Sequence, residues 1–80
     1  MNFLNECINT ESDVRRFVDG LAANNKLYHY EDDPRDVLKN FTNQPLFTNA
    51  ECKLLDKRIE EMCKSNLLEY AFNYTINSYL

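Results

Sequence analysis

The sequence has very few of the residues that interrupt regular structure, with one glycine and two prolines among 80 residues. A fold of many strands needs a turn after each strand, and turns draw heavily on these two residue types. Charged residues make up 28% of the chain and apolar residues 44%, which are proportions typical of a folded domain. The sequence therefore predicts an all-α fold, a single domain over residues 1–80 built as a bundle of three to four helices.

Long apolar runs and a basic N-terminal segment are also missing. No run approaches the roughly 20 apolar residues of a membrane-spanning helix, and residues 1–6 contain no Lys or Arg. We therefore expect no membrane span and no secretory signal, and a cytoplasmic location. Three cysteines without a close pairing motif fit a reducing compartment, so Cys7, Cys52 and Cys63 are predicted to be free, buried thiols.

Positive charge is scarce, because the formal net charge is -4 and the sequence pI about 4.8. Binding to phosphate backbones needs a basic patch, and the Lys and Arg residues of this chain are interleaved with acids. The connection between Phe41 and Thr48 is also longer than the turn of a helix-turn-helix motif. We therefore expect no direct contact with nucleic acid.

The clearest helix is predicted over residues 49–64. Thr48 and Glu51 have the spacing of a capping box, and Phe47 stands where a hydrophobic staple begins. Apolar residues recur at three- and four-residue steps and form one stripe: Cys52, Leu55, Ile59 and Met62. On the surface, Lys57–Glu61 and Glu60–Lys64 have the spacing of ion pairs. We expect this helix at the centre of the fold, packed by Val14, Phe17, Val18, Leu21 and the last helix.

Shorter patterns predict the remaining elements. Residues 2–8 have the spacing of one or two helical turns, which either dock on the core or form a frayed end. A helix capped by Thr10 or Ser12 follows and ends at Asn24-Asn25. Gly20 within that helix indicates a close approach by another helix. Asp33-Pro34 has the form of an N-cap followed by an N1 proline, which predicts a short helix ending near Phe41.

The last segment, Leu67 to Leu80, is apolar over most of its circumference. Its polar residues form one narrow stripe, composed of Asn66, Glu69, Asn73 and Asn77. Asn66 and Glu69 also have a spacing that would cap this helix at its start. Tyrosines suit interfaces, because the ring is buried while the hydroxyl finds a partner. Two interpretations stay open for the apolar side chains, completion of the core or an interface with a partner or second copy: Tyr70, Phe72, Tyr74, Ile76 and Tyr79.

The strongest local charge feature is an acidic connector between the predicted helices. Its candidate partner-binding residues are Tyr28, Tyr30, Glu31, Asp32, Asp33 and Asp36. Such a run can hold a divalent cation, pair carboxylates for acid–base chemistry, or mimic nucleic-acid phosphates. The glycine and closing glutamate of an EF-hand loop are missing. Capping of the short helix also accounts for Asp33 and Asp36 without any function.

Catalytic and metal sites have little support in the sequence. His29 is the single histidine, and a Cys–His pair would still need an orienting group and an oxyanion hole. The three cysteines and His29 match a zinc site in number, but no C-x-x-C spacing is present. We therefore expect a protein without enzymatic activity, metal or cofactor.

From Phe17 to Met62 the chain resembles a loosely defined group of small acidic proteins of phages, prophages and other mobile elements. The similarity rests on Phe17-Val18 with Leu21, on the run from Leu27 to Leu38, on Leu46-Phe47-Thr48 with Glu51, and on Leu55 with Ile59–Met62. The resemblance implies a phage-encoded accessory protein. Small acidic proteins of such neighbourhoods often inhibit host machinery, anti-CRISPR proteins among them. It brings no catalytic residues, and the aromatic C-terminal segment lies outside it.

The leading expectation is therefore a cytosolic inhibitor that binds a host protein, such as a defence nuclease complex that handles nucleic acid. It would do so through the acidic connector or the aromatic helix. The alternative is a homodimeric transcriptional or antitoxin-type regulator, paired through the aromatic helix.

Overall fold

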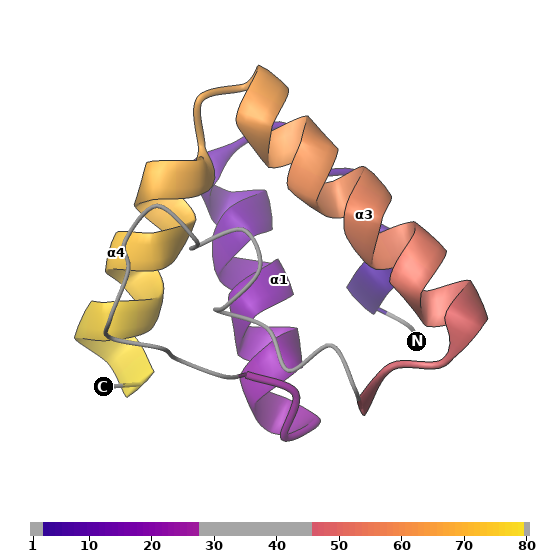
Figure 1. Ribbon diagram of the computed structural model, residues 1–80. Helices are drawn as coiled ribbons and strands as arrows, with labels where there is room; N and C mark the ends of the chain where they lie inside the picture. Colours follow the sequence, from indigo (N-terminus) through magenta and orange to yellow (C-terminus); the bar gives the residue numbers. More distant parts are fainter. Residues whose placement is uncertain (1–2, 28–45, 80) are drawn as a thin grey trace.

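The computed structural model describes residues 3–27 and 46–79. These residues form a 3-10 turn, η1 (Phe3–Asn5), and three α-helices, α1 (Glu11–Ala23), α3 (Asn49–Lys64) and α4 (Leu68–Tyr79) (Figure 1). No β-strand occurs in the described ranges, and the all-α prediction is confirmed. The predicted N-terminal turn is present as η1. The predicted short helix from Pro34 to Phe41 lies outside the described residues.

Capping boxes begin two of the helices. The Thr10 hydroxyl accepts a hydrogen bond from the Asp13 amide, and the Asp13 carboxylate accepts one from the Thr10 amide. Thr48 and Glu51 make the same reciprocal pair at the start of α3, as the sequence predicts. Each box satisfies two backbone N–H groups that a helix start otherwise leaves without partners. Of the two caps considered for α1, Thr10 is the one used.

Left-handed asparagines end α1 and α3. Asn25 has φ 56° and Asn66 has φ 57°. In both cases the following residue donates its amide to the carbonyl five positions back, at 2.8 Å, which is the Schellman pattern. Asparagine tolerates this backbone region better than other residues with a Cβ. The expectation that Asn66 caps α4 is therefore wrong, because Asn66 terminates α3.

The helices are arranged around α1. In Figure 1, α1 and α4 run side by side in the same direction, and α3 lies on the other side of α1 and runs back. α1 packs most extensively on α4, while α3 reaches η1 and α4. The prediction that α3 is the central helix is therefore wrong. The reason is that η1, which the sequence pattern left undefined, stands between α3 and α1 and contacts both.

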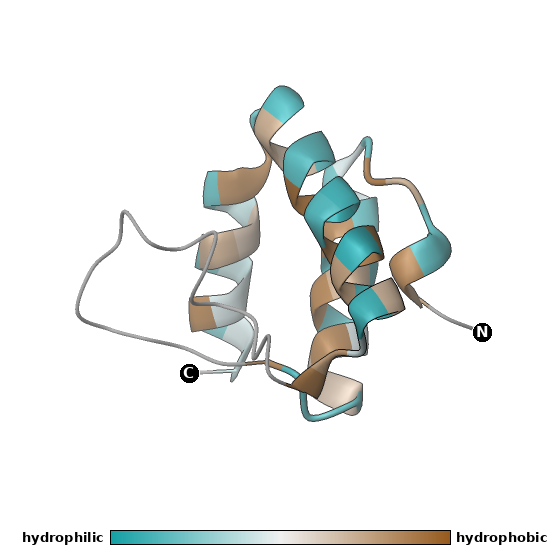
Figure 2. Cartoon of the chain, turned by 45° about the vertical axis from the view of Figure 1, so that its right-hand side comes forward, coloured by the Kyte–Doolittle hydropathy of each residue, from teal (hydrophilic) through white to brown (hydrophobic). Residues whose placement is uncertain are grey.

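The core is shared by all four elements, and each of the three α-helices carries both hydrophobic and hydrophilic residues (Figure 2). Its buried members are Leu4, Ile8, Val14, Phe17, Val18, Leu21, Phe47, Leu55, Met62 and Ala71. The four residues predicted on α1 are all among them. Leu4 and Ile8 of the N-terminal segment are almost fully buried as well, so this segment belongs to the core rather than to a frayed end.

Gly20 marks a close approach, as predicted, but the neighbour is a side chain of η1. A Cβ built on Gly20 would lie 2.5 Å from Cγ of the Phe3 ring. The same ring meets Phe17 with centroids 5.8 Å apart in a tilted arrangement. The missing side chain at Gly20 thus makes room for an aromatic ring that holds η1 against α1.

The inner face of α3 departs from the predicted stripe at one position. Leu55 and Met62 are fully buried, and Cys52 and Ile59 are half-buried against the core. Arg58 is also buried, with only 5% of its surface exposed, although its charge favours an outward position. Long aliphatic stems let arginine cover apolar surface in this way.

Candidate functional site

The acidic connector cannot be placed, since Tyr28, Tyr30, Glu31, Asp32, Asp33 and Asp36 lie outside the described residues. What the structure shows is the two ends of the connection. Asn25 turns the chain away from α1, and Phe47 and the Thr48 cap receive it at α3. Lys26 then ties these ends together: its ammonium group lies 3.2 Å from the Glu51 carboxylate and 4.7 Å from the Phe47 ring centroid.

The tyrosines of α4 are placed along α1 by specific polar contacts. Tyr74 and Tyr79 both donate their hydroxyls to the same carboxylate oxygen of Asp19, at 2.8 and 2.5 Å. Nη1 of Arg15, one turn earlier on α1, donates to the Tyr70 hydroxyl at 2.8 Å. The sequence reasoning did not identify Arg15 and Asp19 as partners, although both lie on α1 at a spacing of four.

The three tyrosine rings also contact one another. Tyr70 and Tyr74 are stacked with centroids 6.4 Å apart, and Tyr79 meets Tyr74 edge-on at the same separation. Tyr70 and Tyr74 are half-buried, whereas Tyr79 is 41% exposed. The row therefore forms a polar and aromatic seam between α1 and α4, and its last ring is the part most open to solvent.

The seam changes the acidity of its phenols. Hydrogen bonding to the Asp19 carboxylate, helped by desolvation, raises the pKa of Tyr79 to about 12. The same two causes raise the pKa of Tyr74 above its ordinary value. Both shifts arise because the neutral phenol donates to the carboxylate, while a phenolate beside it would be repelled.

The other residues of the aromatic helix fall into three groups that differ in burial. Ala71 and Thr75 are fully buried and face the core, and the polar stripe of Glu69, Asn73 and Asn77 is exposed, as the sequence indicates. Phe72 and Ile76 are half-buried, and Phe72 packs against the core. The broad apolar arc of α4 is thus divided between the seam and the core, and most of it is partly covered within one chain.

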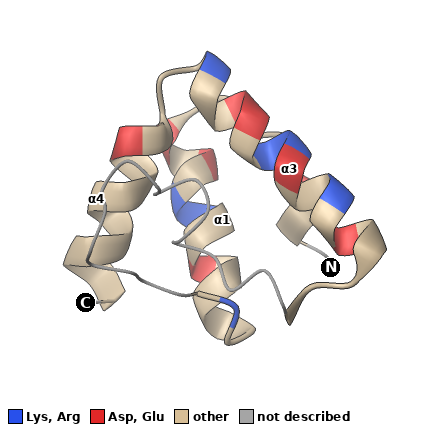
Figure 3. Cartoon of the chain, viewed as in Figure 1, with Lys and Arg blue, Asp and Glu red and all other residues tan. Residues whose placement is uncertain are grey.

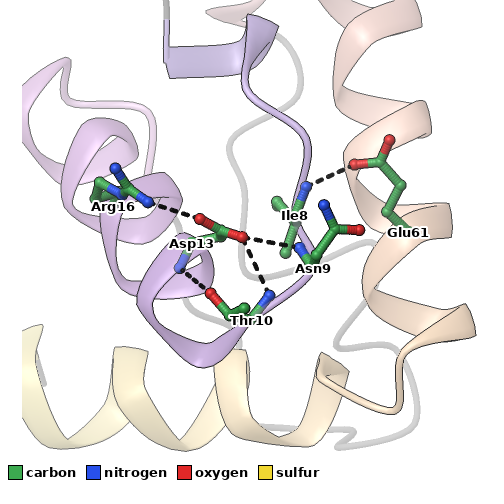
Figure 4. Close-up of polar contacts among 6 residues, drawn as sticks. All are labelled: Ile8, Asn9, Thr10, Asp13, Arg16 and Glu61. Carbon is green, nitrogen blue, oxygen red and sulfur yellow. Dashed lines mark hydrogen bonds and ion pairs between the residues drawn. The ribbon is translucent and has the colours of Figure 1, made fainter.

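A carboxylate of α3 holds the N-terminal segment in place. Oε1 of Glu61 accepts a hydrogen bond from the Ile8 amide at 2.9 Å (Figure 4). Its other oxygen, Oε2, lies 3.2 Å from Nη2 of Arg58. Glu61 therefore does not serve as the surface partner of Lys57 that its spacing suggested. The predicted Glu60–Lys64 pair is present at 3.0 Å.

The α1 cap next to this carboxylate reaches further than a standard capping box. Asp13 Oδ2 accepts from the amides of Asn9 and Thr10, and Oδ1 pairs with Arg16 at 2.7 Å (Figure 4). These bonds, the one from Asn9 first, lower the pKa of Asp13. The bond from the Thr48 amide, together with Lys26, likewise lowers the pKa of Glu51. Both carboxylates are therefore used in building the fold.

The cysteines are free, as predicted, but the expectation that they are buried is wrong for two of them. Cys7 and Cys63 are exposed, and Cys52 is half-buried with its thiol 4.0 Å from the Phe47 carbonyl. Cys63 falls to the side of the apolar stripe, and Cys7 sits in the linker before Ile8. His29 lies outside the described residues. Within the described ranges, no three Cys, His, Asp or Glu residues are grouped in a way that could hold a metal ion.

Comparison with known proteins gives no relative: no family model, curated protein or solved structure matches this chain. None of the helices in the described ranges has the length and apolar character needed to cross a bilayer.

Proposed function

We propose that the chain is a non-enzymatic accessory protein of a phage or mobile element, which binds a host protein in the cytosol and inhibits it. The target that best suits its chemistry is a defence complex with a basic groove for nucleic acid, as in anti-CRISPR inhibition. The proposal rests on the distribution of acidic residues along the chain, together with the resemblance described above.

The observation that carries the proposal is that the acidic run 31–36 has no counterpart among the described residues. There, acids and bases are nearly balanced in number, and they alternate along α3 (Figure 3). Several carboxylates are used for caps and for contacts between elements: Asp13, Asp19, Glu51 and Glu61. In contrast, the connector places Glu31, Asp32, Asp33 and Asp36 within six residues. Concentrated negative charge steers a protein toward a basic groove and orients it there.

The test is an affinity capture from nuclease-treated bacterial lysate, with wild-type protein and a Glu31→Lys/Asp32→Lys variant as parallel baits. The proposal predicts that one nucleic-acid-handling complex is enriched by the wild type and lost with the variant. A matched control, Asp56→Lys/Glu69→Lys, makes the same change of net charge at exposed helix positions and should retain the complex. Equal capture by all three baits would refute a role for the connector.

A second function, a homodimeric transcriptional or antitoxin-type regulator, is favoured by one specific observation. Tyr79 is 41% exposed, and Phe72 and Ile76, also on α4, are only half-buried. Pairing of two copies through α4 would cover this remaining aromatic and aliphatic surface. This function requires a stable dimer, whereas the inhibitor does not.

A further inference from the structure

Two lysines on α3 stand apart from the other cations of the described residues, because Lys53 and Lys57 have no hydrogen-bond or ion-pair partner there. The remaining Lys and Arg side chains of these ranges all have one: Arg15 with Tyr70, Arg16 with Asp13, Lys26 with Glu51, Arg58 with Glu61, and Lys64 with Glu60. Among the residues that the structure describes, unpaired positive charge is therefore confined to Lys53 and Lys57.

Lys53 and Lys57 are four residues apart, so their side chains lie on the same face of α3. Like charges at this spacing destabilise a helix by a few tenths of a kcal/mol, and an acid at either position would remove that cost. Asp56 and Glu60 each follow one of these lysines at a spacing of three, and Glu60 is held by Lys64 at 3.0 Å. A local arrangement that costs stability without a compensating contact points to a function.

The two lysines border a shallow hollow of about 550 Å³ that is lined by Ala50, Lys53, Leu54 and Lys57. We call these four residues the basic edge of α3. Leu54 is half-buried and Ala50 is exposed. Leu46, just before the cap of α3, is 52% exposed, more than any other large apolar side chain in the described ranges. In the hollow, the apolar surface of Leu54 and unpaired positive charge thus occur together on one face of α3.

We propose that the basic edge docks an acidic, amphipathic peptide segment of a partner protein. Carboxylates of that segment would pair with Lys53 and Lys57, and an apolar side chain would enter the hollow against Leu54. Such a segment complements the positive charge of the basic edge, and it would bind in the helix-in-groove mode of peptide recognition. A nucleic-acid backbone fits less well, because two lysines on a chain of net charge -4 give a weak phosphate footprint and the apolar floor would find no partner.

Its four residues are different from those of the acidic connector and of the tyrosine row of α4. It therefore adds a second binding surface of opposite charge to the proposed function, and its test needs no host protein. A partner that offers both a basic groove and an acidic segment would engage the two surfaces together and gain in avidity.

The experiment is a titration of the isotopically labelled full chain with a short helical peptide of leucine and glutamate, followed by backbone amide shifts. The expected result is saturable binding with the largest shifts from Ala50 to Lys57. Lys53→Gln/Lys57→Gln should weaken the affinity by about fivefold, as two partly exposed ion pairs would. Ala50→Glu, which places a repelling carboxylate at the edge in the first turn of α3 where a helix favours an acid, should weaken binding while the chain stays folded.

The matched control is Arg16→Gln/Lys64→Gln, which removes the same charge from side chains that are 62% and 74% exposed. Its affinity should equal that of the wild type. Equal weakening by both double variants would overturn the proposal in favour of a net-charge effect, and a lack of saturable binding would overturn it outright. An oligonucleotide of the same length that binds the edge more tightly than the peptide would assign the surface to phosphate instead.

Discussion

Individual side chains decide three features of this fold that a hydrophobic pattern describes only in part. Gly20 was expected to permit a close approach, but its neighbour is the Phe3 ring rather than a second long helix. Asn66 was expected to begin a helix, but it ends one, because the left-handed conformation at its backbone was not considered. Arg58 was not expected to be buried, since its charge places it with the surface residues in any count of apolar spacing.

Replacement of Gly20 by Ala should destabilise the protein, although alanine is the better helix former by about 1 kcal/mol. The new Cβ would lie 2.5 Å from the Phe3 ring, so η1 must shift away from α1. Chemical denaturation of Gly20→Ala, Phe3→Ala and the double variant tests this. In the Phe3→Ala background the sign should reverse, and alanine at position 20 should raise the free energy of unfolding. A destabilising effect of the same size in both backgrounds would show that the ring is not the cause.

Asn66→Ala should lower the free energy of unfolding by about 1 kcal/mol, because alanine adopts the left-handed conformation poorly. Asn66→Gly should leave stability unchanged or raise it. Asn73→Ala provides the control, because this exposed position within α4 should gain helix propensity. Thermal and urea unfolding of the three variants measure these effects. A loss of stability at position 73 as large as at position 66 would contradict the Schellman assignment.

Among the elements, α1 and α3 were the easiest to predict, because their capping residues are recognisable in the sequence. α1 and α3 have strong caps at both sequence-predicted starts, so their beginnings follow from Thr10 and Thr48. The packing order did not follow, because it depends on Leu4 and Ile8, whose spacing in a short segment resembles that of a frayed end. The sequence pattern also did not predict the seam between α1 and α4, because Arg15 and Asp19 contact residues more than fifty positions away.

Because of the seam between α1 and α4, the free energy of unfolding should fall as the pH rises into the alkaline range. Because the pKa of Tyr79 is raised to about 12 and that of Tyr74 is raised as well, the folded state favours the neutral phenols. Their contribution is fully present below the ordinary tyrosine pKa near 10 and is lost as the pH rises through the folded value. Asp19→Asn removes the main cause, so both tyrosines should then titrate at lower pH.

Spectrophotometric titration of tyrosinate in wild type, Asp19→Asn and Tyr79→Phe measures this directly. Urea unfolding at several pH values between neutrality and the alkaline range should show a smaller fall in stability for Asp19→Asn than for wild type. Identical titration curves for wild type and Asp19→Asn would contradict the role assigned to the carboxylate.

For the molecule as a whole, one predicted binding surface, the aromatic helix α4, lies within the described residues, and the other, the acidic connector, lies outside them. The aromatic side chains of α4 are partly satisfied by α1 and by the core, which reduces the apolar surface left for a second copy. The described ranges expose only two large apolar side chains beyond a third of their area, Leu46 and Tyr79, and these lie on different elements. The acidic connector, which the sequence singled out, remains a prediction.

We therefore expect a monomer at micromolar concentration. Light scattering coupled to size exclusion measures the mass directly, with Tyr79→Ser as a comparison. A wild-type dimer that Tyr79→Ser converts to a monomer would contradict this expectation and support the homodimeric regulator. If both proteins are monomers, α4 does not form an interface with a second copy.

The most direct measurement is the activity of the captured host complex on its nucleic-acid substrate, titrated with purified protein. The account predicts that activity falls to zero near a one-to-one ratio, and that Glu31→Lys/Asp32→Lys abolishes inhibition while its thermal unfolding stays that of the wild type. Asp56→Lys/Glu69→Lys should inhibit normally. Undiminished inhibition by the connector variant, or full activity of the complex with saturating wild-type protein, would contradict the account.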